Sequence, residues 1–341
     1  MTSRRVLITG ANGFVGRHLI AHLLARANED YSVTAAVRPE ELEHLCIQSP
    51  WAGWTGCADS RINVVPFELC NAAQVGAAVR AAEPDWIVHL AARSSGAAAD
   101  REAVMAVNVD GTRNVLEAAS DIRPYPRTLI ISTGYVYGST DPARPAREDD
   151  PIGPLWRFGP YADSKIEMES VARAYRAFAI IARPFAHTGP GQPPAFAVPA
   201  FARQLARIEA GLQPPVLRVG NLAAKRDMLD ARDVVRAYER ILHLGEPGDT
   251  YNVARGAPAA VGDVLDELRS LCHVETEVQV DPERLRPADI ACSSGDPLKL
   301  WTATGWSPRI APGETLRDTL DYWRAVEAPG TEQECAGPSS R

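Results

Sequence analysis

Short apolar runs alternate with helix-length segments from the start of the chain. The runs span residues 5–9, 32–37, 63–67, 86–90, 128–132 and 179–182. Two helix-length segments carry apolar residues on one stripe: Val107, Gly111, Val115 and Ala119 in the first, and Phe201, Leu205, Ile208 and Leu212 in the second. Strands that alternate with crossover helices are typical of the α/β class. We therefore predict a doubly wound, Rossmann-like parallel sheet.

The pattern changes after Arg183, where Pro and Gly interrupt short pieces such as RPFAHTGPGQPP. Such punctuation is typical of a smaller second lobe in the C-terminal part. The segments RDVVRAYERIL and TYNVA predict a helix and a strand that return to the first unit, with Asp230 and Asp233 as N-terminal cap residues. The end of the chain is polar and turn-rich, which predicts disorder. The expected division is 1–183 plus 227–256 for the first domain, 184–226 plus 257–325 for the second lobe, and 326–341 for a disordered tail.

The composition of the 341 residues narrows the class of protein. With 45% hydrophobic and 23% charged residues, the chain is globular, not fibrous or disordered. Its formal net charge of -7 gives no general attraction to a phosphate backbone, so we expect no nucleic-acid partner. No apolar run is long enough to cross a bilayer, so we expect no membrane contact and a cytoplasmic protein. The six cysteines include no CxxC pair, which predicts neither a metal site nor a disulfide framework.

A glycine-rich turn follows the first predicted strand. VLIT runs directly into GANGFVG, and a helix is expected to begin near Phe14. Glycines at such a place permit a tight turn and bring a pyrophosphate close to the amides of a helix N-terminus. An ordinary glycine-rich turn is the alternative, but the order of strand, turn and helix favours a dinucleotide site. The predicted cofactor contacts of this turn are Gly10, Asn12, Gly13, Phe14, Val15 and Gly16.

The residue after the second predicted strand bears on the choice of cofactor. An acidic residue there would bind the ribose hydroxyls of NAD, but this chain has Arg38. A guanidinium pairs well with a 2′-phosphate, so Arg38 favours NADP(H) over NAD(H), with an ordinary surface arginine as the alternative. Glu68 and Leu69, after the third strand, are expected to flank the adenine.

Tyr161 and Lys165 in PYADSK are four residues apart, so they share one face of a helix. A free phenol has a pKa of about 10, and a nearby ammonium stabilises its phenolate, so the pair is suited to acid/base chemistry. Thr133 ends the fifth strand, at the carboxyl edge where open α/β sheets bind ligands, and its hydroxyl is suited to a substrate carbonyl. Each motif is common by itself. Their combination with the glycine turn favours catalysis.

Together, TGxxGxxG, HLAA at 89–92, Asn108, STGYVYG and YxxxK resemble the extended short-chain dehydrogenase/reductases that act on nucleotide sugars. The resemblance spans nearly the whole chain. GPGQ at 189–192, VGNLAAKRDMLDARDVVRAY, RLRPAD and TGWSPRI are similar to the branch of that family that contains GDP-mannose 4,6-dehydratases and GDP-4-keto-6-deoxy-mannose reductases. Within this branch the segments look most like the reductases that form GDP-D-rhamnose.

The resemblance implies an activity and a role for each matching residue. It implies reduction of the C4 keto group of GDP-4-dehydro-6-deoxy-D-mannose by NADPH. This GDP-linked sugar would be the small-molecule partner of the protein, and the protein itself would be a homodimer. Tyr161 would be the general acid, Lys165 would lower its pKa and hold the nicotinamide ribose, and Thr133 would orient the carbonyl. Further cofactor contacts would be Leu90, Ala91, Ala92 and Asn108, the last as a structural residue or a support of the lysine through water. Substrate contacts would be Arg93, Thr133, His187, Gln192, Asn221, Arg226 and Arg286, with Arg226 and Arg286 as diphosphate ligands.

Several alternatives stand beside the reductase. A 4,6-dehydratase would carry a carboxylate where this chain has Tyr135, and an epimerase-reductase would carry a cysteine in the STG segment and a histidine after GP. Ala186 and Arg93 replace an asparagine and a glutamine that the resembled families usually have. A cofactor-sensing protein without catalysis would be expected to have lost Tyr161 or Lys165, and both are present. We therefore predict the reductase, with the dehydratase, another nucleotide-sugar epimerase/reductase and such a sensor as alternatives.

Overall fold

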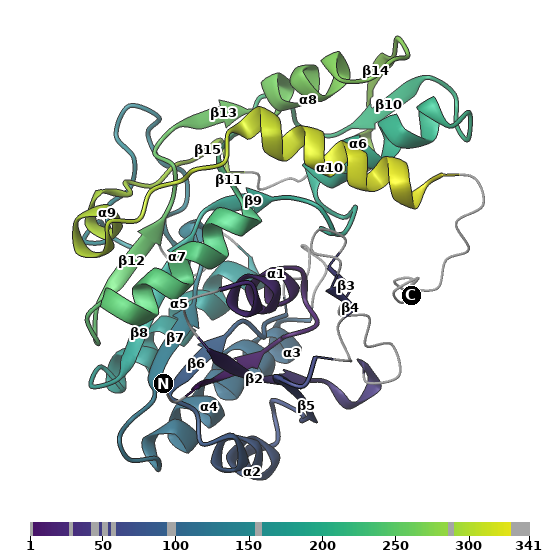
Figure 1. Ribbon diagram of the computed structural model, residues 1–341. Coiled ribbons are helices and arrows are strands. Elements are labelled where there is room, and N and C mark those ends of the chain that lie inside the picture. Colours follow the sequence, from purple (N-terminus) through teal and green to yellow (C-terminus); the bar gives the residue numbers. More distant parts are fainter. Residues whose placement is uncertain are drawn as a thin grey trace.

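The computed structural model describes residues 3–26, 30–41, 48–49, 54–55, 59–93, 100–153, 159–285 and 290–328. A twisted sheet lies between two layers of helices, and a smaller lobe of helices and short strands lies above it in Figure 1. Within the described part of the chain, no helix has the length and apolar character needed to cross a membrane.

Seven parallel strands form the main sheet. They are β1 (Arg4–Thr9), β2 (Tyr31–Val37), β5 (Ile62–Pro66), β6 (Trp86–His89), β7 (Arg127–Ile131), β8 (Ala179–Pro184) and β12 (Thr250–Val253). Their spatial order is β12-β8-β7-β6-β1-β2-β5, and every neighbouring pair is parallel. The order reverses between β1 and β6, and sheets of this kind bind ligands outside the carboxyl ends of the strands at such a point. The predicted doubly wound sheet is confirmed.

Helices cover both faces of this sheet (Figure 1). One face packs against α1 (Phe14–Leu24) and α7 (Ala231–Leu244), and the other against α2 (Ala72–Ala82), α4 (Gly111–Ser120) and α5 (Pro160–Ala174). Alternate strand residues enter the two cores, so Val6 and Ile8 lie in one and Leu7 in the other. Burial on both faces explains why the strands are apolar along nearly their whole length.

The second lobe has its own core. Its elements are β9 (Ala186–Thr188), α6 (Ala197–Glu209), β10 (Val216–Val219), β11 (Lys225–Asp230), β13 (Pro258–Ala260), α8 (Val261–Ser270), β14 (Glu277–Val280), β15 (Cys292–Ser293) and α10 (Pro312–Val326). Buried residues such as Phe201, Leu265 and Leu320 join α6, α8 and α10. The short helix α9 (Leu298–Thr304) packs instead on α7. A further two-stranded ladder joins β3 (Gln48–Ser49) to β4 (Trp54–Thr55).

The helical stripes differ from the predicted ones at their ends. The stripe of residues 107–119 begins in a π-helical segment, Ala106–Asp110, which follows α3 (Arg101–Met105) and leads into α4. The other predicted stripe extends beyond its helix. The helix α6 ends at Glu209, and Leu212 lies after it with 49% of its surface exposed. Apolar spacing by itself does not fix where a helix ends.

Two expected boundaries fall inside ordered elements. Residue 227 lies within β11, which pairs with β9, β13 and β15, so the chain returns to the main sheet only with α7 and β12. The expected tail from residue 326 begins within α10, and Glu327 forms ion pairs with Arg203 at 2.6 Å and Arg207 at 2.7 Å. Residues 329–341 lie outside the described residues.

Candidate active site

The glycine turn after β1 has the geometry of an anion cradle. Gly10 has a φ of +66°, and a Cβ there would lie 2.8 Å from the Ala91 nitrogen. A Cβ at Gly16 would lie 2.5 Å from the Gly10 carbonyl oxygen, so α1 packs directly against the turn. Gly13 is the N-cap of α1 and brings no side chain to bond the first amides of the helix. These amides are available to an anionic group, so the pyrophosphate of a dinucleotide fits here.

Several other predicted cofactor residues lie in this turn or next to it. Asn12, Phe14 and Val15 belong to the turn and the start of α1, and Leu90, Ala91 and Ala92 follow β6 beside Gly10. Glu68 is half-buried after β5, but the Leu69 side chain is 6% exposed and packs in the core, where a Cβ at Gly111 would lie 2.5 Å from its Cγ. The Leu69 side chain therefore packs under α4, and its place beside the adenine stays a prediction.

A buried histidine joins the glycine turn to the helix that carries Asn108. The Thr9 hydroxyl lies 2.8 Å from His89 Nδ1, and His89 Nε2 lies 2.9 Å from the Thr112 hydroxyl. Thr112 donates its only proton to the Asn108 carbonyl at 2.7 Å, so it accepts from Nε2, and Nδ1 accepts from Thr9. Thr9 in turn accepts the Ala91 amide at 3.2 Å. Burial lowers the pKa of His89 to about 3, so the imidazole is neutral, as this series of bonds requires.

Asn108 connects the loop after β6 to the start of α5. Its Oδ1 accepts the Arg93 amide at 2.7 Å, and its Nδ2 donates to the Arg93 carbonyl at 3.1 Å and to the Ser164 hydroxyl at 2.8 Å. Ser164 donates to the Tyr161 carbonyl at 2.7 Å. Both Nδ2 protons are thus in use, and in this structure Asn108 positions the backbone around Tyr161.

Thr133, Tyr161 and Lys165 meet at the carboxyl end of β7. The Thr133 hydroxyl accepts the Tyr135 amide at 3.3 Å and hydrogen-bonds the Tyr161 phenol. Lys165 Nζ lies 5.8 Å from the centroid of the Tyr161 ring and donates to the Ile131 carbonyl at 2.7 Å. α5 carries Tyr161 and Lys165 on successive turns that face the end of the strand. The structure brings the three predicted catalytic residues together.

Burial sets the protonation states of this group. It raises the pKa of Tyr161 to about 12, helped by the neighbouring Tyr135 and opposed by the hydrogen bond from Thr133. Burial also lowers the pKa of Lys165 to about 8, against the opposing effect of Glu169. At neutral pH the phenol therefore carries its proton and the lysine is mainly an ammonium. A phenol in this state can donate a proton to an oxygen atom, and the ammonium stabilises the phenolate that remains.

Arg38 lies directly after β2, as predicted. Its Nε donates to the Glu41 carboxylate at 3.0 Å, and its NH1 lies 3.0 Å from Glu40. The side chain is 58% exposed, so a ligand can reach the guanidinium. A 2′-phosphate at this place would have to share the guanidinium with Glu41 or displace it.

Two predicted substrate residues build the loop after β8. His187 Nδ1 donates to the Phe185 carbonyl at 2.9 Å, and burial lowers the pKa of the ring, which stacks on Phe14 with centroids 6.3 Å apart. Gln192 is buried, donates to the His187 carbonyl at 3.1 Å and accepts from the Thr188 hydroxyl at 2.7 Å. The Gln192 amide thus makes two hydrogen bonds within this segment, and its contact with the substrate stays a prediction.

Of the remaining predicted substrate residues, three lie in the part of the chain that the structure describes. Arg93 is exposed after β6, and Asn221 is exposed and accepts the Ala223 amide at 3.0 Å. Arg226 in β11 donates to the Ile290 carbonyl at 2.7 Å. Arg286 lies outside the described residues.

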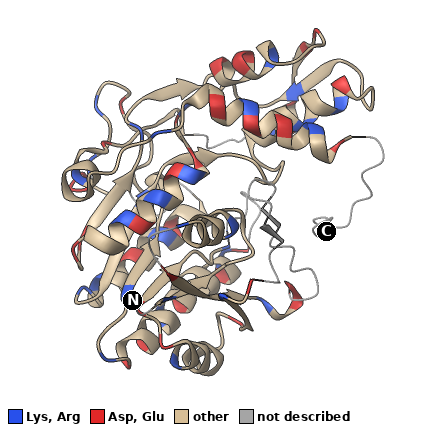
Figure 2. Cartoon of the chain, in the orientation of Figure 1, with Lys and Arg blue, Asp and Glu red and all other residues tan. Residues whose placement is uncertain are grey.

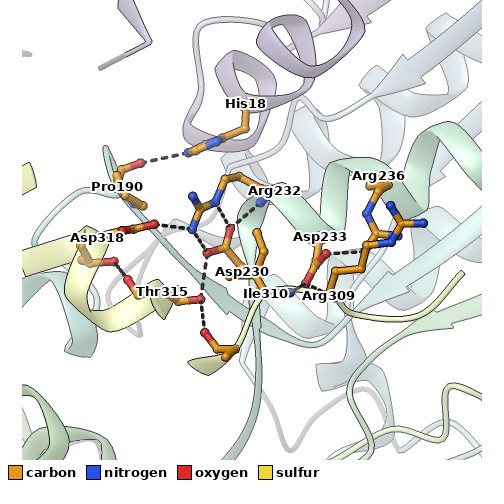
Figure 3. A network of polar contacts seen from close by, with 12 residues as sticks. His18, Pro190, Asp230, Arg232, Asp233, Arg236, Arg309, Ile310, Thr315 and Asp318 are labelled. Carbon is orange, nitrogen blue, oxygen red and sulfur yellow. Dashed lines mark hydrogen bonds and ion pairs between the residues drawn. The ribbon is translucent and has the colours of Figure 1, made fainter. Parts of the chain in front are cut away.

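A polar network ties the second lobe to α1 and α7 (Figure 3). His18 of α1 lies 2.9 Å from the Pro190 carbonyl through its Nε2. Asp230 accepts the Arg232 amide at 2.8 Å, which confirms it as the cap of α7. The Arg232 guanidinium then bridges Asp230 and Asp318 of α10, at 2.7 Å to each. This network holds the loop of residues 187–192 beside the start of α1.

Sequence reasoning left two neighbours of Tyr161 out of the site. Ser164 connects Asn108 to the Tyr161 carbonyl, and the Tyr135 phenol is close enough to raise the pKa of Tyr161. Ser164 is three residues after Tyr161, so its helical spacing is a usable signal once the helix is known. The sequence identifies Tyr135 only as the residue that replaces a dehydratase carboxylate, and its proximity to Tyr161 emerges only when the strand end and α5 are placed side by side.

The fold and this site define a nicotinamide-dependent oxidoreductase of the extended short-chain dehydrogenase/reductase class. The family model described as GDP-mannose 4,6 dehydratase matches residues 7–319, and the chain belongs to this family. It is 33% identical over 333 residues to a GDP-6-deoxy-D-mannose reductase of Pseudomonas aeruginosa, with 95% of this chain and 98% of the relative covered. The predicted family and the prediction of an oxidoreductase are confirmed.

Solved structures agree with this assignment. The structure of RMD from Pseudomonas aeruginosa complexed with NADPH has a TM-score of 0.78 at 31% identity and covers 95% of this chain and 100% of that one. The UDP-glucose 4-epimerase of Thermus thermophilus in complex with NAD has a TM-score of 0.77 at 29% identity, covering 94% and 99%. A nicotinamide cofactor is thus common to these relatives, and it matches the cradle at Gly10 to Gly16.

Proposed function

We propose that this enzyme uses NADPH to reduce the C4 keto group of GDP-4-dehydro-6-deoxy-D-mannose and forms GDP-D-rhamnose. The observation that carries the proposal is the group of Thr133, Tyr161 and Lys165, in which one protonated phenol lies beside a hydroxyl and an ammonium. The GDP-6-deoxy-D-mannose reductase of Pseudomonas aeruginosa, at 33% identity, supports the same class of substrate.

Reduction of a ketone needs a hydride at the carbon and a proton at the oxygen. The nicotinamide cofactor supplies the hydride when it is bound at the glycine turn. Thr133 orients the keto oxygen by a hydrogen bond, and Tyr161 transfers its phenolic proton to that oxygen. Lys165 stabilises the phenolate through its charge, and the phenolate then takes a proton from solvent. One acid suffices for this reaction.

Arg38 supports NADPH as the preferred form of the cofactor. Arg38 follows β2, at the place where folds of this kind bind the adenosine ribose. Its guanidinium is exposed, and the parallel N–H groups of a guanidinium are suited to a 2′-phosphate. The NADPH in the RMD structure from Pseudomonas aeruginosa supports the same choice. NAD(H) is the less favoured alternative because it lacks the 2′-phosphate that would pair with Arg38, although Glu41 competes for the Arg38 guanidinium.

The 4,6-dehydratase is the second candidate because the family model carries that description. Elimination of water from the sugar needs further proton transfers at C5 and C6. The neighbour of Tyr161 at this strand end is Tyr135, and a phenol is a poor substitute for the carboxylate that a dehydratase would use there. This chemistry supports the reductase over the dehydratase.

Two incubations test the proposal. In the first, the purified protein receives GDP-mannose and oxidised cofactor; in the second, it receives the 4-keto-6-deoxy sugar nucleotide and NADPH. We expect no conversion in the first and formation of GDP-D-rhamnose, identified by NMR, in the second. Conversion of GDP-mannose to a keto product would identify a dehydratase. A product with another configuration at C4 would overturn the assignment of GDP-D-rhamnose.

We expect the protein to form a homodimer through the helices that flank the fourth and fifth strands of the chain order, α4 and α5. This expectation comes from the resemblance to the extended short-chain family. Size-exclusion chromatography with light scattering would give twice the mass of 36.9 kDa. A mass equal to one chain at micromolar concentration would contradict it.

A further inference from the structure

A cavity of about 210 Å³ lies beside α7, lined by Arg26, Arg236, Glu239, Arg240, Gly305, Trp306 and Arg309. Arg26 follows the end of α1, and α1 runs away from the glycine turn. This part of the cavity therefore lies at the C-terminal end of α1, whereas the glycine turn that would hold the pyrophosphate lies at its N-terminal end. Lys and Arg form blue bands along α7 in Figure 2, and Figure 3 shows Arg236 and Arg309 next to each other.

The carboxylate in the wall of the cavity is already satisfied. Glu239 has a side chain that is 2% exposed, and one of its oxygens lies 2.8 Å from His22 Nε2. The other lies 3.0 Å from Arg26 Nε and 3.1 Å from the Tyr31 hydroxyl. Both oxygens of Glu239 are therefore occupied by His22, Arg26 and Tyr31, and Glu239 is not the partner of Arg236, Arg240 or Arg309.

Two of these arginines are held in place largely by backbone carbonyls. Arg240 donates from Nε to the Thr304 carbonyl at 3.0 Å, and Arg236 donates to the Ser307 carbonyl at 2.7 Å. Arg236 also forms an ion pair with Asp233. Carbonyl partners fix the direction of a guanidinium without neutralising its charge.

Arg309 completes the excess of positive charge. Its backbone amide donates to Asp233 at 2.9 Å, but its guanidinium makes no hydrogen bond or ion pair with any residue in the described ranges. Around the cavity, four guanidinium groups thus face two carboxylates, Glu239 and Asp233. This excess occurs in a chain whose formal net charge is -7, so it does not follow from a basic composition.

We propose that this cavity is a binding site for the phosphate groups of a small ligand, separate from the cofactor and sugar-nucleotide site. Guanidinium forks match phosphate oxygens, and a partly enclosed site strengthens such contacts. A water molecule occupies about 30 Å³, so the volume equals that of about seven waters. This space suits a diphosphate or a small phosphomonoester and is too small for a whole dinucleotide.

Isothermal titration of the full chain with inorganic pyrophosphate, in phosphate-free buffer, tests the site. Because Arg309 has no described side-chain partner, Arg309→Gln removes the charge without disturbing the fold, and Arg309→Glu reverses it. Arg317→Gln is the matched control, since Arg317 is an exposed arginine on α10 outside the cavity. Any binding of pyrophosphate at the glycine turn is common to all four proteins and cancels in the comparison.

We expect the parent and Arg317→Gln to bind pyrophosphate equally, Arg309→Gln to bind about tenfold more weakly, and Arg309→Glu to lose the site. A parallel titration with glycerol phosphate distinguishes an organic phosphomonoester from free diphosphate as the ligand source. Equal binding by the parent and Arg309→Glu, or no binding of either phosphate compound by the parent at millimolar concentration, would overturn the proposal.

Discussion

Two buried cations, Lys165 of α5 and Arg183 of β8, differ in their partners. Arg183 pairs with Glu169 through two contacts, at 2.9 and 2.7 Å. Burial opposes its charge, but the carboxylate prevails and raises the pKa of Arg183. Lys165, one turn before Glu169, donates instead to the Ile131 carbonyl, and burial lowers its pKa to about 8. Of these two cations, Arg183 of β8 is neutralised by its carboxylate partner and Lys165 of α5 is not.

The difference in partners gives the two cations different roles, one in the stability of the fold and the other in catalysis. A buried charge with a matched carboxylate contributes to the fold, and its field is largely cancelled outside the pair. An ammonium that contacts a neutral carbonyl keeps its field for a neighbouring group, which here is Tyr161 at 5.8 Å from ring centroid to Nζ. We therefore expect changes at the pair to affect folding and changes at Lys165 and Tyr161 to affect the reaction.

The largest expected effect is at Tyr161. Tyr161→Phe removes the proton donor and leaves the glycine turn unchanged, so turnover should fall by about 10²- to 10⁴-fold. Cofactor binding, followed by fluorescence titration, should remain nearly that of the parent, and the unfolding midpoint should change little. Turnover within a few-fold of the parent would show that the phenol is not the acid.

Glu169 tests the other half of the comparison. Glu169→Gln leaves the buried guanidinium of Arg183 without its counter-charge, which should cost about 3–5 kcal/mol of unfolding free energy. Urea denaturation would measure this loss. Lys165→Met is the matched variant on the same helix and should lose activity while keeping most of the stability of the parent. A stable Glu169→Gln protein, or a Lys165→Met protein as unstable as Glu169→Gln, would break the comparison.

The ion pair of Arg38 with Glu41 is exposed, in contrast to the buried pair of Arg183 with Glu169. Since solvent screens its contact with Glu41, a 2′-phosphate can replace that contact at small cost. Arg38→Ala should reduce the preference for NADPH over NADH by about 10- to 100-fold in kcat/KM. Glu41→Gln is the control, because it should preserve or increase that preference. Equal use of both cofactors by the parent would contradict this role of Arg38.

The pH dependence of kcat/KM should follow the loss of the proton from the Lys165 ammonium. Its pKa is lowered to about 8, so the ammonium is present below that pH and is lost as the pH rises through it. The rate should therefore fall above pH 8, by about tenfold per pH unit if catalysis depends on the ammonium. In Lys165→Arg the guanidinium stays charged, so any remaining activity should lack this alkaline decline. An unchanged decline in Lys165→Arg would assign it to another group.

Local patterns in the sequence predicted most of the fold. The strands lie within two residues of the predicted runs, because strands covered on both faces are apolar along their length. The glycine turn and the pair of Tyr161 and Lys165 were also found, since each depends on spacing within one element. The end of α6 was missed because Leu212 continues the apolar stripe although the helix stops at Glu209.

The parts of the site that depend on distant residues were not predictable. His89 connects partners that are 80 and 23 residues away, and neither spacing leaves a mark on the local sequence. Gln192 was expected to contact the substrate, because a polar residue in a loop has the same sequence signature whether it binds a ligand or its own loop. In the structure Gln192 hydrogen-bonds to His187 and Thr188, and its contact with the substrate stays a prediction.

The most direct test of the central claim, a reduction that uses one acid, is to run the reaction in D₂O with the 4-keto sugar nucleotide and NADPH. The carbons at C3 and C5 lie next to the ketone, so any further acid/base group of the site would exchange their hydrogens with solvent. With Tyr161 as the only proton donor to the substrate, NMR of the product should show no more deuterium at C3 and C5 than an enzyme-free control. Enzyme-dependent deuterium at either carbon would contradict the account and indicate epimerase or dehydratase chemistry.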